Sequence, residues 1–155
     1  AGGSGKSTLF KQLQFIHKKG FQPKERRGFI SHIHGQCIDA LQKLIDSCED
    51  RYNDDPQNNK DFKLYNYDDS DDVDDVKNSN DIKDAATFIT SLKANTNLIE
   101  RADVVAVMLK LWQNETIQMM FALRNEIAVP DSTEYYFNNM DRITDPNYEP
   151  SDEDL

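Results

Sequence analysis

The sequence has few cysteines and no long apolar run, and each shortage excludes a class of protein. Only Cys37 and Cys48 occur among the 155 residues, too few for a disulfide scaffold or a four-cysteine zinc site. One expected helix holds both thiols about 16 Å apart, which is beyond disulfide reach and fits a reducing compartment. Since no stretch of about 18 apolar residues is present, we expect neither a membrane span nor a secretory signal in this chain.

Positive charge is also scarce, and it is unevenly placed. The chain has 18 Lys+Arg against 28 Asp+Glu, for a net charge of −10. Nucleic acid is therefore not an expected partner, because its phosphates are bound by Lys and Arg. Residues 1–27 carry seven bases and one acid, whereas residues 54–81 carry ten Asp and three Lys. Since like charges repel, we expect a solvated or disordered acidic loop at 54–81, with weak cation binding as the minor alternative.

Apolar residues recur every three or four positions, and this spacing predicts an all-α helical bundle. A first helix is expected over 9–16, ending at Gly20 with Pro23 just beyond. A long helix over about 25–50 carries the apolar stripe Ile30, Ile33, Cys37, Leu41, Leu44 and Cys48. Shorter helices are expected over 82–92, 98–112, 117–127 and 132–143. The stripe expected to face the core in the second of these is Leu98, Ala102, Val105, Leu109 and Trp112.

Two short segments resemble helix starts. Asp131 stands three residues before Glu134, as in a capping box that opens the helix of 132–143. Ser151 stands in the same relation to Asp154, but the chain stops at Leu155. This spacing gives the expectation that the sequence is a piece cut from a longer protein. The histidines do not stand at a metal-ligand spacing, so no metal site is expected from them.

The opening of the chain carries a glycine-rich motif. Its first seven residues, AGGSGKS, match the last seven positions of the P-loop pattern G-x-x-x-x-G-K-[ST]. Glycines let backbone N–H groups turn toward phosphate oxygens, Lys6 supplies charge to the phosphates, and the Ser7 hydroxyl coordinates Mg²⁺. The predicted phosphate-binding residues are Gly2, Gly3, Ser4, Gly5, Lys6, Ser7 and Thr8. A plain glycine-rich tail before a helix is the alternative.

On two segments the sequence resembles the α subunit of heterotrimeric G proteins. GSGKSTLFKQLQFIH, from Gly3, is similar to the family's G-E-S-G-K-S-T-x-x-K-Q-M/L-x-x-x-H. Residues 109–155 are similar to its L-W-x-D…F-x-R-x-x-E-Y/F…D-S-x-x-Y-Y…R-I…P-x-Y-x-P-x-x-x-D-L pattern. These segments cover about 60 residues, counted from the two matches. Residues 24–108 match the family only in their helical layout.

This resemblance implies a domain organisation and a set of ligands. Residues 1–23 would be the P-loop, first helix and linker of a Ras-like GTPase domain. Residues 24–155 would be the all-helical insertion domain, which closes over bound GTP or GDP. Ser7 matches the family's Mg²⁺ ligand, and Asp131 and Ser132 match a pair that faces the nucleotide. The family's catalytic Arg and Gln and its D-x-x-G and N-K-x-D motifs would all lie beyond Leu155, so no catalytic residue is assigned here.

The resemblance also implies partners and a location. The family couples G protein-coupled receptors to effectors through a GTP/GDP switch with GTP hydrolysis, and its members bind a βγ dimer and GTPase-accelerating regulators. Its members act at the cytoplasmic face of the plasma membrane. Gly3 departs from the family, which usually has Glu at this position, and we expect its loss to weaken nucleotide retention. The alternatives are a non-enzymatic helical interaction module and an ATP-using P-loop kinase with a helical lid.

Overall fold

The structure is a computed structural model that describes residues 23–65, 73–93 and 95–154. All regular elements in these ranges are helical and no strand is present among them, as the predicted all-α class requires. The predicted P-loop and first helix lie outside the described residues. Within the described part, no helix is both long enough and apolar enough to cross a membrane.

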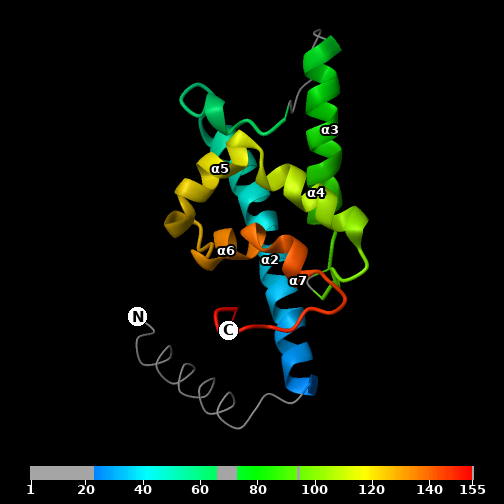
Figure 1. Cartoon of the computed structure of the whole chain (residues 1–155). Helices are drawn as coiled ribbons and strands as arrows, with labels where there is room; N and C mark the ends of the chain where they lie inside the picture. Colours follow the sequence, from blue (N-terminus) through cyan, green and yellow to red (C-terminus); the bar gives the residue numbers. More distant parts are fainter. Residues whose placement is uncertain (1–22, 66–72, 94, 155) are drawn as a thin grey trace.

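Six α-helices and two 3₁₀ turns follow one another in the described chain. They are α2 (Pro23–Asp54), η1 (Lys60–Phe62), α3 (Val73–Thr90), α4 (Ala102–Trp112), α5 (Glu115–Ala122), η2 (Arg124–Glu126), α6 (Ser132–Asn138) and α7 (Met140–Ile143). The helix α2 has 32 residues and is therefore about 48 Å long. It runs through the middle of the molecule, and α3, α4, α5 and α6 all pack against it (Figure 1).

The long helix α2 confirms the apolar stripe predicted for it, except that Ile30 is only half-buried. Its buried residues step by three and four positions: Ile33, Cys37, Leu41, Leu44 and Cys48. The neighbouring positions Ile38 and Ile45 are buried as well, which widens the stripe so that several helices can share it. The helix begins at Pro23, which suits the first position because that residue needs no hydrogen-bond donor there.

An aromatic cluster joins α4, α5 and α6 on one side of α2. The Trp112 and Phe137 rings stack with centroids 4.4 Å apart, and Phe121 meets Trp112 edge-on at 5.0 Å. Between α4 and α5, the Asn114 side chain caps α5 by accepting hydrogen bonds from the backbone N–H groups of Thr116 and Ile117. This cap confirms the break expected between the helices predicted over 98–112 and 117–127.

The core face predicted for the α4 region is right only in part: Leu98 and Trp112 are buried. Its buried residues are Val104, Met108, Leu111 and Trp112, whereas Val105 and Leu109 are half-buried and Ala102 is exposed. The sequence ADVVAVMLKLW is apolar on nearly every side, so spacing alone does not fix which side faces α2 and α3. Ala102, Val105 and Leu109, which we expected inside, line a surface groove of about 410 Å³ instead.

Parts of the acidic segment 54–81 are helical in the structure. The 3₁₀ turn η1 lies in its first part, Leu64 is buried beside α2, and α3 already begins at Val73. Acidic residues in the first turn of a helix are favoured by its positive N-terminal dipole, so an Asp-rich sequence is no obstacle to starting α3 there. Residues 66–72 lie outside the described part of the chain.

The helix predicted over 132–143 is two helices. The first, α6, ends at Asn138, and α7 follows after Asn139, whose φ of −110° and ψ of 20° are not helical. The Asn139 side-chain amide donates to the Tyr135 carbonyl at 2.8 Å, in addition to the Asn139 backbone N–H at 3.2 Å. The predicted apolar face nevertheless holds across the break, since Tyr136, Met140 and Ile143 are all buried.

Candidate functional site

Two of the predicted nucleotide-facing residues belong to the described structure. Asp131 and Ser132 lie side by side at the start of α6, and both are exposed. The other predicted site residues, including the metal ligand Ser7, lie outside the described chain: Gly2, Gly3, Ser4, Gly5, Lys6, Ser7 and Thr8. The site that the structure describes is therefore the turn that carries Asp131 and Ser132.

Buried residues on both sides hold this turn in place. Val129 is buried and donates its backbone N–H to the Arg124 carbonyl at 3.1 Å. Thr133 is also buried, and its N–H donates to the Pro130 carbonyl at 3.2 Å. Ala128 has a φ of 58°, a left-handed conformation that turns the chain from η2 toward α6. The anchored flanks leave the two polar side chains facing outward.

The predicted capping role of Asp131 is wrong. Its φ and ψ, −61° and −32°, are already helical, and its side chain makes no capping hydrogen bond. The carboxylate instead pairs with the Arg124 guanidinium. Arg124 is itself fixed, because it lies over the Phe121 ring at 4.8 Å and donates to the Phe121 carbonyl. An arginine seven residues upstream therefore competes successfully for the carboxylate.

The chemistry of the turn suits neutral polar groups. The Ser132 hydroxyl both donates and accepts hydrogen bonds, and the Asp131 carboxylate accepts them. A bare phosphate beside Asp131 would face like charge, softened only by Arg124. Neutral hydrogen-bonding groups such as hydroxyls or amines are therefore the better match for this surface.

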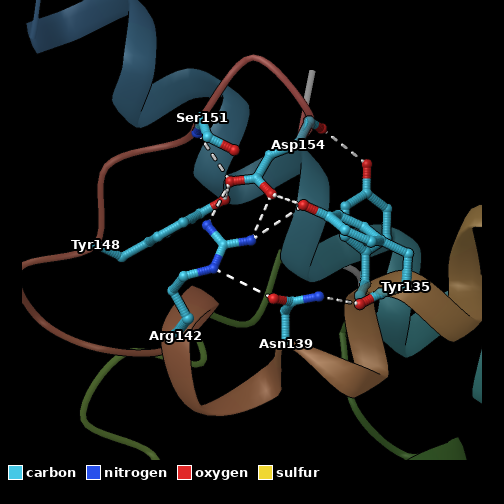
Figure 2. A network of polar contacts seen from close by, with 7 residues as sticks. Tyr135, Asn139, Arg142, Tyr148, Ser151 and Asp154 are labelled. Carbon is cyan, nitrogen blue, oxygen red and sulfur yellow. Dashed lines mark hydrogen bonds and ion pairs between the residues drawn. The ribbon is translucent and has the colours of Figure 1, made fainter.

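Asp154 forms a second polar cluster, against the middle of α6. The residue is only 3% exposed. Arg142 donates to both carboxylate oxygens at 2.7 and 2.8 Å, Tyr135 and Tyr148 donate their hydroxyls at 2.8 and 2.6 Å, and the Ser151 N–H donates at 2.9 Å. The two tyrosines reach the carboxylate from opposite sides (Figure 2). We call these five residues the Asp154 cluster.

Electrostatics explain why a charge is stable in this buried place. Burial alone would raise the pKa of the Asp154 carboxyl. The donors from Arg142, Tyr148, Ser151 and Tyr135 outweigh burial and hold that pKa well below its ordinary value of 3.8. The same contacts act on a partner, since burial and the nearby carboxylate raise the pKa of Tyr148. Asp154 is therefore ionised at neutral pH.

Only part of the Asp154 cluster has a signal in the sequence. The predicted pairing of Ser151 with Asp154 is confirmed, and residues 152–154 form a turn. The other partners, Arg142 and Tyr135, lie 12 and 19 positions before Asp154, so no local pattern links them. Arginine and two tyrosines ahead of a lone Asp become informative only when the fold brings them together.

The buried histidine His34 links three parts of the fold. Its Nε2 donates to the Ile143 carbonyl at 2.7 Å, and its Nδ1 accepts from the Leu98 N–H. Both ring nitrogens are thus used in joining α2 to α7 and to the loop before α4. Among the described residues there is no cluster of three acid, histidine or cysteine side chains suited to a metal ion.

Comparison with known proteins covers the whole chain. The G-protein alpha subunit family matches residues 1–155. The chain is similar to guanine nucleotide-binding protein alpha-1 subunit of Pisum sativum, at 28% identity over all of the chain and 37% of that relative. It is similar to the alpha-6 subunit of Caenorhabditis elegans at 27% identity, over 98% of the chain and 37% of the relative.

A third relative is the alpha-9 subunit of Dictyostelium discoideum, 29% identical over all of the chain and 38% of its own length. The chain thus spans little more than a third of each of these relatives. The family match is nonetheless continuous from the glycine-rich opening to the Asp154 cluster. On this evidence the chain belongs to the G-protein alpha subunit family.

Proposed function

We propose that this chain is the phosphate-binding start and the helical cover of a guanine-nucleotide-binding signal transducer. The observation that carries the proposal is the family match over residues 1–155, which includes both the G-S-G-K-S-T segment and the Asp131–Ser132 turn. The relatives are named as guanine nucleotide-binding proteins. The division into residues 1–23 as part of a GTPase domain and 24–155 as a helical domain belongs to this proposal.

The residues of the opening segment would hold the phosphates. Backbone N–H groups from Gly2 to Gly5 would surround phosphate oxygens, and Lys6 would place its ammonium group beside them. Ser132 and Asp131 would meet the nucleotide from the opposite side, where their exposed hydroxyl and carboxylate suit its sugar or base. The helices behind this turn would then exclude water from the bound nucleotide.

Mg²⁺ is part of the proposed site through Ser7. A serine hydroxyl and phosphate oxygens are hard oxygen donors, which is the donor type that Mg²⁺ prefers. When bound, the ion would neutralise charge on the phosphates. The acids and histidines of the described helices offer no competing site.

The signalling role extends to the intact protein. We infer that it hydrolyses GTP with residues supplied outside this chain, and that it couples a receptor to an effector. Its proposed partners are a βγ dimer, a G protein-coupled receptor, an effector and GTPase-accelerating regulators. Its proposed place is the cytoplasmic face of the plasma membrane. These proposals rest on family membership.

The decisive experiment is guanine-nucleotide binding by the intact parent protein with Mg²⁺. Lys6→Ala removes the phosphate-binding charge, so we expect GDP affinity to fall at least tenfold. Lys110→Ala is the matched control, because Lys110 is an exposed lysine on α4 and is not one of the proposed site residues. Absence of nucleotide binding by the wild-type protein would favour a non-enzymatic helical interaction module.

The glycine at position 3 supplies a second test of the same site. The family usually has Glu there, and Gly3 lacks any side chain to help enclose the nucleotide. We expect Gly3→Glu to slow GDP release from the full-length protein. Equal release rates for the two forms would remove this idea and leave the proposed binding site standing.

A further inference from the structure

The last described residues of the chain are tied to the helix that carries the candidate site. Asp154 accepts from the Tyr135 hydroxyl through its carboxylate, and its backbone carbonyl accepts from the Tyr136 hydroxyl at 3.0 Å. These tyrosines lie three and four residues after Ser132, one turn further along α6. The segment 148–154 therefore holds the same short helix that presents Ser132.

Several charged and polar contacts hold the Asp154 carboxylate in one orientation. Arg142 grips both oxygens of Asp154, and its guanidinium also lies 5.5 Å from the centroid of the Tyr148 ring. It donates in turn to the Tyr135 hydroxyl at 3.2 Å, which closes a ring of contacts (Figure 2). Bidentate arginine–carboxylate pairs fix direction as well as distance. A shift of Asp154 would therefore also displace the Tyr135 side chain.

The helix α6 is short, so a movement at one position reaches the others. The helix has seven residues, so only about 10 Å separates its first residue from its last. Its buried side holds Thr133, Tyr136 and Phe137 against the core, which leaves little freedom to bend within the helix. A displacement imposed at Tyr135 is therefore passed on to Ser132.

We propose that Asp154 is a positioning residue that locks segment 148–154 to α6 and thereby keeps Ser132 and Asp131 against the nucleotide. This inference rests on the proposed function, since it names how nucleotide release from that same site is slowed. Asp154 itself touches no nucleotide. Its effect passes through Tyr135 and the first turn of α6.

The test uses the full-length protein loaded with fluorescent GDP, whose release is followed after adding unlabelled GDP. We expect Asp154→Asn to release GDP about tenfold faster, because a neutral amide loses the ion pair with Arg142. Tyr135→Phe removes one hydroxyl donated from α6, and we expect release to rise about threefold. Melting temperature is measured for each variant alongside the release rate.

Tyr148→Phe is the matched control for Tyr135→Phe. It removes the same chemical group from the same carboxylate, but Tyr148 lies in the segment with Asp154 and not on α6. We expect its melting temperature to fall as in Tyr135→Phe while its release rate stays within twofold of wild type. If Asp154→Asn fails to fold, the contrast between the two tyrosine variants decides the question alone.

Two outcomes would overturn the inference in different ways. Wild-type release rates in Asp154→Asn and Tyr135→Phe, together with lowered melting temperatures, would make the Asp154 cluster purely structural and leave the proposed function intact. The same conclusion follows if Tyr148→Phe speeds release as much as Tyr135→Phe. A wild-type protein that binds no GDP would instead remove the proposed function, and the inference with it.

Discussion

The long helix α2 and the segment around Asp154 are stabilised by different physics. Along α2, apolar side chains such as Leu41 and Leu44 are fully buried among neighbours from several helices. Around Asp154, the buried group is a charge that is stable only because Arg142 and two tyrosines surround it. Dispersion and the hydrophobic effect tolerate imprecise geometry, whereas a buried charge requires every donor in place. The two regions should therefore respond differently to substitution.

Leu44→Ala should give the largest loss of stability. Leu44 has no exposed surface, so the substitution removes buried methyl groups and leaves a cavity at the centre of the bundle. We expect a loss of about 3 kcal/mol in the free energy of unfolding, measured by urea denaturation. Lys43→Ala on the same helix is the control, since Lys43 is partly exposed and pairs with the exposed Asp39. A loss under about 1 kcal/mol for Leu44→Ala would show that the region repacks easily.

Arg142→Met should come next. It removes the only cation in the Asp154 cluster while keeping the apolar stem that covers Tyr148. Arg142 is 40% exposed, and three other donors to Asp154 remain. We therefore expect a loss of about 2 kcal/mol in the free energy of unfolding, which is less than for a fully buried ion pair. Arg101→Met, which breaks an exposed ion pair with Asp103, should cause no measurable change. Equal urea midpoints for both variants would contradict the expected difference between a buried and an exposed ion pair.

A pH titration should give a smaller effect through His34. Burial lowers the pKa of His34 below 6.5, and the hydrogen bond to the Ile143 carbonyl offsets this only in part. The unfolded chain therefore takes up the proton first, so stability is full above pH 6.5 and falls as the pH drops toward the folded pKa. The slope cannot exceed about 1.4 kcal/mol per pH unit for one proton. The difference between the urea midpoints at pH 7 and pH 5 should be smaller in His34→Gln than in the wild type. In His32→Gln it should stay as large as in the wild type.

Asp131→Asn should have the smallest effect on stability. The Asp131 carboxylate is 79% exposed, so its ion pair with Arg124 lies mostly in water. We expect a change below about 0.5 kcal/mol in thermal denaturation. A nucleotide-binding defect without loss of stability would then mark Asp131 as a site residue, and a large stability loss would mark it as a structural one.

The sequence predicted the apolar half of this comparison well. The stripe from Ile33 to Cys48 and the break between α4 and α5 follow from apolar spacing, which depends on near neighbours in the sequence. The core face of α4 could not be predicted, because Val104 and Val105 are equally apolar and only the packing partner decides which is buried. The spacing of apolar residues predicts the buried side of a helix only where the opposite side is polar.

Most of the polar contacts, those of Asp131 and Asp154, could not be predicted from the sequence. Asp131 and Glu134 have the spacing of a capping box, yet Arg124 takes the carboxylate in the folded chain. Asp154 gains donors from three different stretches of sequence, and only the path of the chain after α7 brings them together. For the candidate site, family resemblance identified Asp131 and Ser132 but did not indicate what holds their helix. That support depends on tertiary contacts.

The buried cysteines have a practical consequence for labelling. Cys37 and Cys48 are both free and buried in α2, and burial raises the pKa of each thiol to about 12. Almost no thiolate exists at neutral pH, so alkylating reagents should react with these positions very slowly. A single Ser132→Cys substitution would then accept a fluorophore or spin label selectively within this chain. The natural thiols can stay, and a reporter can be placed directly on the turn proposed to cover the nucleotide.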